Sequence, residues 1–244
     1  MIKRFFSLLF CSLFFVRCSN GTAQQRDGFI KNVNAKEFKT LVDAGDGITL
    51  DVRTPEEVAA GQIPNASTIN FYDSDFVEKI NLMNKEKEIY VYCKVGGRSA
   101  QAAEILNQNG FKKVYNLSGG INAWVGEGFQ VTKSANAKDE NIKQMTLAEF
   151  NTILNTDKPV LIDFHTLWCS PCKKMAPVVD KIEKQYQGKA VVQRIDVDKS
   201  KEIAKQYQVQ GVPVFILFKK GKAVWKHTGI IAEETLTQQI ESNL

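Results

Sequence analysis

Short apolar runs alternate with amphipathic segments along the first half of this 244-residue chain. A helix is predicted to begin at Thr54, where Pro55 and Glu57 complete the sequence of a capping box. This alternation of strands and helices predicts a mainly parallel sheet with helices on its faces. The other elements expected here are strands at 48–52, 89–92 and 114–117, and helices over 99–109 and from Gly119.

The second half repeats the alternation with different spacing. Its last two apolar runs flank Lys220-Gly221 and are typical of an antiparallel pair, so the second sheet is predicted to be mixed. The elements expected here are strands at 160–164, 190–197, 214–218 and 223–227, and helices over 146–154, from about Cys169 to Tyr186, over 199–206 and from Ala232.

A polar stretch separates the two halves. Residues 131–141 carry no apolar periodicity, and we expect them to link a domain at 29–130 to a domain at 142–244. The chain is long enough for two ordinary domains. The predicted fold class is therefore α/β, with a parallel-sheet domain followed by a mixed-sheet domain.

The first 20 residues have the pattern of an export signal. Basic residues precede a short apolar run at 5–16, which is too short to span a bilayer comfortably. Three outcomes are open: lipidation of Cys18 as the first mature residue, cleavage after the small residues 21–23, or retention as an uncleaved anchor. We expect an exported protein of the periplasm or cell envelope, which contacts the membrane only through a lipid anchor if Cys18 carries one.

Charge argues against a nucleic-acid partner. The formal net charge is +5, but Lys3, Arg4 and Arg17 lie in the predicted signal segment, and no basic block occurs elsewhere. The five cysteines are also informative. Cys11 lies in the signal run, so Cys93, Cys169 and Cys172 are the cysteines of the folded body besides Cys18, too few for a disulfide framework. Their sequence contexts favour redox work instead, and we expect Cys93 and Cys169 each to be held as an exposed anion at the start of a helix.

The Cys93 loop has the composition of an anion cradle. Cys93 follows a predicted strand and precedes a predicted helix. Gly96 and Gly97 let successive backbone N–H groups turn toward the sulfur, and the positive end of the helix dipole adds to them. A thiolate is the reactive form of cysteine, so this setting suits a working sulfur.

Charged and polar residues complete this loop. Lys94 and Arg98 are expected to supply positive charge for a thiolate, a persulfide or an anionic donor, and Ser99 is expected to cap the helix. Four residues separate Cys93 from Arg98, one fewer than in cysteine phosphatases. A tighter loop should fit a sulfur atom better than a tetrahedral phosphate.

Residues 29–130 resemble a single rhodanese domain. The resemblance implies that Cys93 carries a persulfide taken from thiosulfate or another sulfane-sulfur donor, and that Arg98 and Lys94 hold the anionic end of the donor. Gln62 and Asn65 depart from the family pattern at scaffold positions. The alternative is a degenerate domain kept as a binding module. The matching segments are 50–53, 56–57, 61–66, 92–93, 96–99 and 117–121 with Trp124.

The second centre is Cys169-Ser170-Pro171-Cys172, at the start of a predicted helix. The helix N-terminus stabilises the Cys169 thiolate as the attacking group, and Cys172 resolves the mixed disulfide one turn later. Trp168 is expected to shield the pair. Zinc is the main alternative, but a structural site takes four ligands, and the sequence offers no second CxxC nearby and only two histidines.

Residues 141–244 resemble thioredoxin from end to end. The resemblance implies that Cys169 is the nucleophile, that Cys172 is the resolving cysteine, and that the two form a redox-active disulfide. It also implies a cis-Pro213 that presents the Val212 backbone to substrates, and a buried Asp163 that assists deprotonation of Cys172. The matching positions are Asp163, Phe164, 168–173, Pro177, Asp196, Asp198, 211–213, Lys220-Gly221 and Gly229.

Two roles in this half keep alternatives. Burial should raise the pKa of Asp163 toward a useful range, unless it is a partly solvated strand residue. His165 either packs or perturbs the dithiol electrostatically. Ser170 replaces the commonest glycine between the cysteines, and because the middle residues tune the potential, the sequence does not separate an oxidant from a reductant.

Three functions follow from this sequence. The first is a thioredoxin-type protein-disulfide reductase coupled to a rhodanese-type sulfurtransferase. The second is a general disulfide reductase of the envelope whose first domain only docks or senses. The third is a persulfide carrier that is not an enzyme. The expected partners are protein thiols or disulfides, a sulfane-sulfur donor and a membrane thiol reductase; no cofactor or metal is expected.

Overall fold

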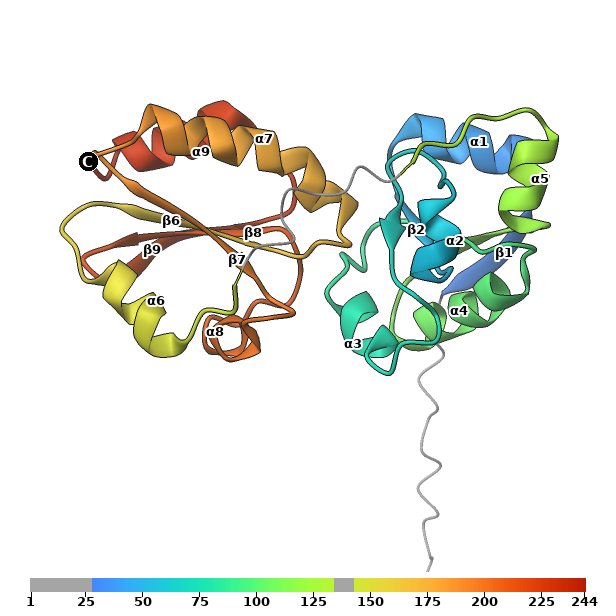
Figure 1. Cartoon of the computed structure of the whole chain (residues 1–244), viewed down its shortest axis with the longest axis horizontal. Coiled ribbons are helices and arrows are strands. Elements are labelled where there is room, and N and C mark those ends of the chain that lie inside the picture. Colours follow the sequence, from blue (N-terminus) through green and yellow to red (C-terminus); the bar gives the residue numbers. More distant parts are fainter. Residues whose placement is uncertain (1–27, 134–142) are drawn as a thin grey trace, which may run out of the picture.

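The computed structural model describes residues 28–133 and 143–244 (Figure 1). The predicted signal at 1–20, with Cys18, and most of the predicted linker lie outside these residues. Among the described residues, no helix is both long enough and apolar enough to span a bilayer. The described residues form two α/β units, each built on its own sheet.

The first unit contains a five-stranded sheet in the order β1-β5-β4-β2-β3, in which every pair of neighbours is parallel. The predicted parallel sheet is thereby confirmed. All four residues of β4 are buried, as expected for a central strand covered on both faces. The elements are β1 (Phe29–Val33), α1 (Ala35–Ala44), β2 (Ile48–Asp51), α2 (Pro55–Ala59), β3 (Ser67–Thr68), α3 (Phe76–Asn81), β4 (Ile89–Tyr92), α4 (Gly97–Gln108), β5 (Lys113–Leu117) and α5 (Gly120–Gly126).

Helices cover both faces of this sheet. Helices α1 and α5 lie on one face, where Phe38 and Trp124 are buried, and α3 and α4 lie on the other, where Phe76 and Leu106 are buried (Figure 1). The predicted capping box at the start of α2 is present in full. Thr132, inside the stretch expected to be a linker, pairs with Gln62 in an isolated antiparallel bridge. This bridge ties the end of the first unit back to its own sheet region.

The second unit contains a mixed four-stranded sheet in the order β7-β6-β8-β9. Strand β6 is parallel to β7 and antiparallel to β8, and β8 is antiparallel to β9, so the predicted mixed sheet is also confirmed. Helices α7 and α9 cover one face, and α6 and α8 the other (Figure 1). The elements are α6 (Leu147–Leu154), β6 (Val160–His165), α7 (Ser170–Gln185), β7 (Val191–Asp196), α8 (Lys201–Gln206), β8 (Val214–Lys219), β9 (Lys222–Thr228) and α9 (Glu233–Glu241).

The two units share apolar packing. One continuous cluster of buried side chains runs from Phe76 and Met83 in the first unit to Trp168 and Val212 in the second. An exposed ion pair between Glu78 and Lys201 joins them as well, at 2.9 Å. The second unit is thus docked against the first, on the side of β3 and α3, rather than only tethered to it.

Candidate active sites

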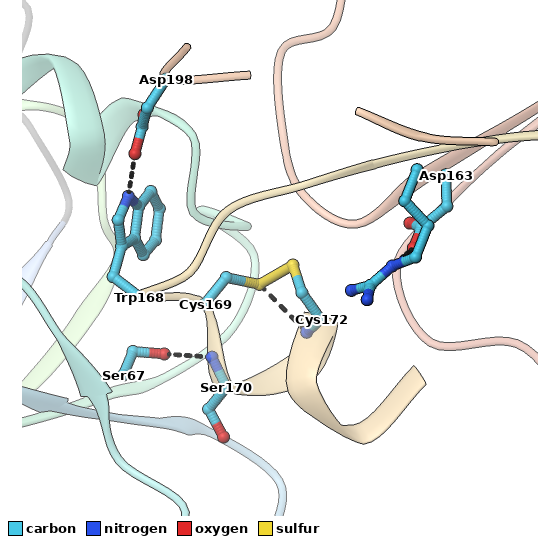
Figure 2. Close-up of a disulfide and its surroundings, with 8 residues drawn as sticks. Ser67, Asp163, Trp168, Cys169, Ser170, Cys172 and Asp198 are labelled. Atoms are coloured by element: carbon cyan, nitrogen blue, oxygen red, sulfur yellow. Dashed lines mark hydrogen bonds and ion pairs between the residues drawn. A yellow bond between two sulfur atoms is a disulfide. The ribbon is translucent and has the colours of Figure 1, made fainter. Parts of the chain in front are cut away.

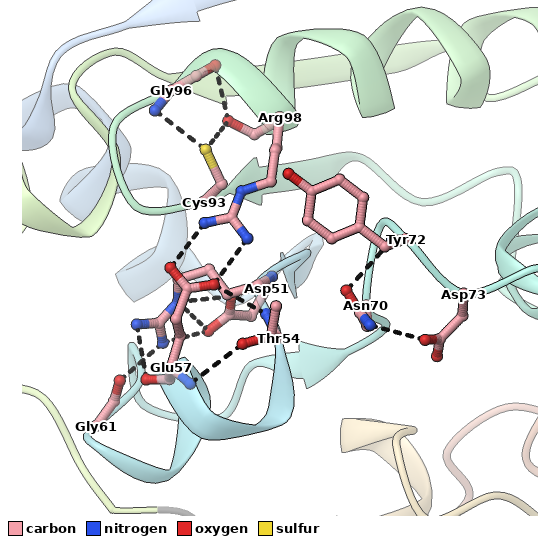
Figure 3. Close-up of polar contacts among 12 residues, drawn as sticks. Asp51, Thr54, Glu57, Gly61, Asn70, Tyr72, Asp73, Cys93, Gly96 and Arg98 are labelled. Carbon is pink, nitrogen blue, oxygen red and sulfur yellow. Dashed lines mark hydrogen bonds and ion pairs between the residues drawn. The ribbon is translucent and has the colours of Figure 1, made fainter.

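Cys93 occupies the turn between β4 and α4, two elements fixed by the parallel sheet. The Gly96 N–H donates to Cys93 Sγ at 3.1 Å (Figure 3). Gly96 has φ 98°, a left-handed conformation that glycine adopts without a steric penalty. The predicted backbone cradle is therefore present at Gly96, while Gly97 is exposed at the start of α4.

Ser99 does not cap the helix, contrary to the sequence prediction. Helix α4 begins at Gly97, two residues earlier than predicted, and Gly96 takes the N-cap position without a side-chain cap. The buried Ser99 hydroxyl instead donates to Cys93 Sγ at 3.5 Å and lies 3.1 Å from the Gly96 carbonyl oxygen. The positive φ of Gly96 starts the helix early, which leaves Ser99 inside the first turn and facing the sulfur.

Opposing effects act on the pKa of Cys93. Burial by itself raises the pKa of the thiol, but hydrogen bonds from the Ser99 hydroxyl and from the backbone N–H groups of Ser99, Val95 and Gly96 favour the thiolate. The net result is a pKa of Cys93 below its ordinary value. The loop therefore stabilises an anionic sulfur mainly through hydrogen bonds.

Arg98 does not present a free positive charge to the loop. Its two terminal nitrogens donate to the two carboxylate oxygens of Glu57, each at 2.7 Å (Figure 3). The hydrogen bonds from Arg98 hold the pKa of Glu57 at about 2. Sequence analysis gave Glu57 only a capping role and missed this pair, since 41 residues separate its partners. The positive charge that Arg98 was expected to supply is thus largely neutralised locally, and Lys94 is exposed to solvent.

A second guanidinium anchors the helix that carries Glu57. Arg53 is buried and donates to both carboxylate oxygens of Asp51, and also to the carbonyl oxygens of Glu57 and Gly61. A buried ion pair is stable only when its remaining polar atoms are also bonded, and these carbonyl contacts meet that need. The network anchors helix α2, which carries Glu57 toward Arg98.

The dithiol lies at the start of α7. Cys169 and Cys172 form a disulfide, and the Cys172 N–H donates to Cys169 Sγ at 3.1 Å (Figure 2). Cys169 is the N-cap residue of α7, so its sulfur lies at the positive end of the helix. This is the placement that the sequence predicted for an attacking thiolate.

Both sulfur centres are buried, whereas the sequence analysis expected exposed reactive groups. Cys93 is 1% exposed and Cys169 is 2% exposed. Cys93 and Cys169 both belong to the apolar cluster that the two units share. The sequence pattern places a sulfur at a helix start, but it carries no information about a domain that packs over it.

Trp168 is buried in the same apolar cluster as the dithiol and is fixed by a hydrogen bond. Its Nε1–H donates to Asp198 Oδ2 at 2.8 Å (Figure 2). Burial raises the pKa of Asp198, the Trp168 bond opposes that rise, and the nearby Asp196 carboxylate adds to it. Trp168 is only 8% exposed, so it is held between the two units rather than facing solvent.

Asp163 lies in the middle of β6 and is 1% exposed, which excludes the partly solvated alternative. The Arg194 Nε donates to Asp163 Oδ2 at 3.2 Å from the neighbouring strand β7. A guanidinium favours the ionised carboxylate, whereas burial favours the neutral acid. The sequence prediction considered burial alone. His165, at the end of the same strand, is also buried.

The loop before β8 carries Val212 and Pro213, the remaining residues that the resemblance places beside the dithiol. The Val212–Pro213 peptide bond is cis, as the resemblance implied. Val212 is 8% exposed, and its N–H donates to the Leu82 carbonyl oxygen of the first unit at 3.0 Å. The backbone expected to receive substrates is therefore already bonded. Within residues 28–133 and 143–244, no three His, Cys, Asp or Glu side chains are grouped as a metal ion would require.

Comparisons with known proteins agree with this architecture. The family model described as "Rhodanese-like domain" matches residues 34–127, and that described as "Thioredoxin" matches residues 141–242. The chain is 36% identical to "Thioredoxin 1" of Nostoc sp. over 114 residues, which cover 47% of this chain and 100% of that protein. It is 35% identical to "Thioredoxin" of Pseudomonas aeruginosa over 106 residues, 43% of this chain and 98% of that protein.

A plant relative matches over a smaller share of its own length. The chain is 39% identical to "Thioredoxin Y, chloroplastic" of Oryza sativa over 103 residues, 42% of this chain and 61% of that protein. The fold and these matches together define the class: a mixed-sheet α/β domain with a helix-start dithiol. The chain belongs to the thioredoxin family, and a rhodanese-like domain precedes its thioredoxin domain. The suspected fusion is thereby confirmed, and the disulfide at Cys169 and Cys172 supports thiol–disulfide exchange by the thioredoxin domain.

Proposed function

We propose that this protein is an exported thiol–sulfur enzyme in which a sulfurtransferase centre feeds a protein-disulfide reductase centre. One observation carries the proposal. Both sulfurs accept a hydrogen bond at 3.1 Å from the backbone N–H three residues later, at the start of a helix. This geometry favours a thiolate at Cys93 and, after reduction, at Cys169.

The first step loads Cys93. The Cys93 thiolate attacks the outer sulfur of thiosulfate or of another sulfane-sulfur donor, an S–S bond breaks, and sulfite or the corresponding thiolate leaves. Cys93 then holds a persulfide, which the N–H of Gly96 and the hydroxyl of Ser99 stabilise as an anion. Lys94 and Arg98 attract the anionic donor in this proposal, although Arg98 must share its charge with Glu57.

The second step unloads the sulfur onto the dithiol. The Cys169 thiolate attacks the outer sulfur of the persulfide, which releases the Cys93 thiolate and leaves a persulfide on Cys169. Cys172 then attacks Cys169, hydrosulfide leaves, and the disulfide forms. The sulfane sulfur gains two electrons and the dithiol loses two, so a membrane thiol reductase must return two electrons for each turnover. In this proposal, Asp163 accepts the proton of Cys172.

The sheet geometry supports transfer within one chain. Tyr92 of β4, Asp51 of β2 and Thr68 of β3 lie in one row across the sheet. Cys93 follows Tyr92, and Thr68 contacts the Trp168 carbonyl oxygen. Strands β4 and β3 are two strand spacings apart, about 10 Å. The Cys93 loop and the Trp168 backbone therefore lie near each other at the carboxyl-terminal ends of these strands. Because both cysteines are buried, the outer sulfur must move before Cys169 can reach it.

Two single variants test the division of labour. Cys93→Ser should abolish thiosulfate-dependent release of sulfide and leave reduction of insulin disulfides, driven by dithiothreitol, within twofold of the parent. Cys169→Ser should abolish both insulin reduction and sulfide release but still allow one sulfur atom to be added to Cys93, as intact-protein mass spectrometry would detect. Loss of both activities in Cys93→Ser, or of neither, contradicts the proposal.

A specific observation favours a second function. Arg98 is already paired with Glu57 and Cys93 is buried, which suits a rhodanese-like domain that docks or senses rather than turning over. In that case insulin is reduced, but thiosulfate neither labels Cys93 nor yields sulfide. Labelling of Cys93 without release of sulfide would indicate a persulfide carrier.

A further inference from the structure

The rhodanese-like domain contacts the backbone on both sides of the dithiol. The Thr68 N–H donates to the Trp168 carbonyl oxygen at 3.1 Å, and the Ser170 N–H donates to Ser67 Oγ at 2.9 Å (Figure 2). Both contacts come from β3, the two-residue outer strand of the first sheet. The main chain before and after Cys169 is thus held by the neighbouring domain.

A third backbone contact occupies the loop opposite the dithiol. The Leu82 carbonyl oxygen, just beyond α3, accepts the Val212 N–H at 3.0 Å. A backbone N–H has one hydrogen to donate, so Val212 cannot bond to Leu82 and to an extended substrate segment at the same time. The side chains also join the two domains here, because Met83 of the first domain lies in one buried cluster with Trp168 and Cys169 of the second.

We infer that the rhodanese-like domain occupies the protein-binding surface of the thioredoxin dithiol, so that an external protein disulfide gains access only when the two domains separate. This inference rests on the proposed function of the dithiol. In the docked form the surface around Cys169 is covered by the rhodanese-like domain of the same chain. In the separated form it faces other proteins.

Covalent connection strengthens this competition. Both domains belong to one chain, so docking is intramolecular, and a competing protein must overcome an effective concentration on the order of millimolar. If the separated form is a small fraction of the population, the apparent affinity for protein substrates falls by that same fraction. The choice of acceptor would then depend on the docking equilibrium and not on the dithiol alone.

Small disulfides should be affected less than proteins. A cleft of about 370 Å³ remains open between the docked domains, lined on the thioredoxin side by Pro171, Lys174 and Pro213 and on the other by Asn65 and Lys87. It reaches Ser170 and Pro171, the two residues between the cysteines, so a small local opening there exposes the dithiol to a small molecule. A compound the size of hydroxyethyl disulfide can enter such a space, whereas a folded protein cannot.

Leu82→Asp tests the inference on the full chain. Leu82 is partly buried and packs on the shared cluster, so a carboxylate there should separate the domains. We expect insulin reduction to rise at least tenfold, hydroxyethyl disulfide reduction to rise less than threefold, and alkylation of reduced Cys169 by a polyethylene-glycol maleimide, a reagent too large for the cleft, to quicken at least tenfold. Val77→Asp is the matched control, because it places the same charge on α3 at a side chain that is 43% exposed, and it should change none of these rates.

A milder pair of variants guards against misfolding. Glu78→Lys and Lys201→Glu each place like charges at the exposed ion pair and should raise insulin reduction about twofold by weakening docking. The double exchange restores the attraction and should return the rate to that of the parent. Such a restoration cannot come from general loss of structure.

The outcomes separate the inference from the proposed function. Unchanged alkylation and unchanged insulin reduction in a folded Leu82→Asp protein would overturn the inference, with the function intact. Faster alkylation of Cys169 with no insulin reduction by any variant would support the inference that docking covers Cys169, and it would refute the proposed reductase function. Equal acceleration with insulin and with hydroxyethyl disulfide would also overturn the inference, since docking would then not discriminate by size.

Discussion

The loops of Cys93 and Cys169 stabilise a negatively charged sulfur in the same way with two different sequences. Each follows a buried strand, precedes a helix, and offers its sulfur a backbone N–H from the residue three positions later, at 3.1 Å in both cases. Gly96 permits the turn through a positive φ, whereas Cys169 itself acts as the N-cap of its helix. What the two loops share is therefore the placement of the sulfur at a helix start, and not a sequence motif.

The two loops differ in the bonding partner of the sulfur and in their contacts with the other domain. Among the described residues Cys93 is outside any disulfide and gains an additional hydrogen bond from Ser99, whereas Cys169 is bonded to Cys172. Both sulfurs lie in the apolar cluster that the two domains share, but the Cys169 loop is also hydrogen-bonded to a side chain of the other domain, through the Ser170 N–H that donates to Ser67 Oγ. The inferred separation of the domains would therefore uncover the backbone beside Cys169, where a protein disulfide has to bind.

The largest expected effect comes from Gly120→Ala, which should damage the Cys93 loop alone. Gly120 has φ 59°, and a Cβ there would lie 2.4 Å from the Cys93 carbonyl oxygen. Left-handed strain and this overlap with backbone should together lower the free energy of unfolding of the first domain by about 3 kcal/mol or more. Denaturant unfolding would measure the loss, and insulin reduction should persist under conditions where the second domain stays folded.

Gly126→Ala is the matched control for this variant. Gly126 ends the same helix, α5, and a Cβ there would meet no atom within 4 Å. We expect its stability to remain within about 1 kcal/mol of the parent, because alanine favours a helix over glycine. Equal losses in the two variants would mean that the Cys93 loop does not depend on the close approach of Gly120.

Glu57→Gln sharpens the comparison, because it removes the carboxylate that pairs with Arg98 beside the Cys93 loop. The pKa of Glu57 is lowered from 4.5 to about 2, so its stabilisation is complete above about pH 4.5 and is lost as the pH falls toward 2. The pair is partly exposed, so the variant should cost roughly 1–2 kcal/mol at pH 6. Denaturant unfolding of variant and parent should converge near pH 2.

The exposed neighbour Glu56 supplies the control for that change. Glu56→Gln removes one negative charge from the same first turn of α2 without touching Arg98. Its acid unfolding should follow that of the parent. If Glu56→Gln and Glu57→Gln lose stability equally at pH 6, the helix dipole and not the Arg98 pair accounts for the effect.

The smallest expected effect is that of Ser99→Ala on the reactivity of Cys93. The Ser99 hydroxyl lowers the pKa of Cys93, so its removal should raise that pKa and reduce the thiolate fraction at neutral pH. One long hydrogen bond to a charged group should correspond to a roughly 3- to 10-fold slower labelling by thiosulfate at pH 7. The rate should recover at higher pH, and Ser99→Thr, which keeps a hydroxyl, should resemble the parent. A pH profile identical to the parent would exclude Ser99 from stabilising the thiolate.

Much of the fold could be predicted from local sequence. The capping box at Thr54 and Glu57 depends on residues three apart, and it is present as predicted. The alternation of strands and helices predicted a parallel and a mixed sheet, because strand order follows from connections of limited length. The disulfide of Cys169 and Cys172 likewise joins residues within a single turn.

Contacts between distant segments could not be predicted in this way. Arg98 was expected to face a donor, yet its partner Glu57 lies 41 residues earlier. The Ser67 contact with Ser170 spans 103 residues and joins two domains, and neither residue has a context that marks it as an interface. Such contacts depend on how whole surfaces fit, so periodicity and motifs carry no signal for them.

The position of β3 has a consequence for self-association. It is the outermost strand of its sheet, and the N–H of Thr68 points away from β2 to the Trp168 carbonyl oxygen. An outer strand with an unsatisfied amide is a template on which a strand from another molecule can add. The contact that covers the dithiol therefore also satisfies the edge strand β3 of the parallel sheet. A protein whose two domains stay separated would expose this edge and would be prone to aggregate through it.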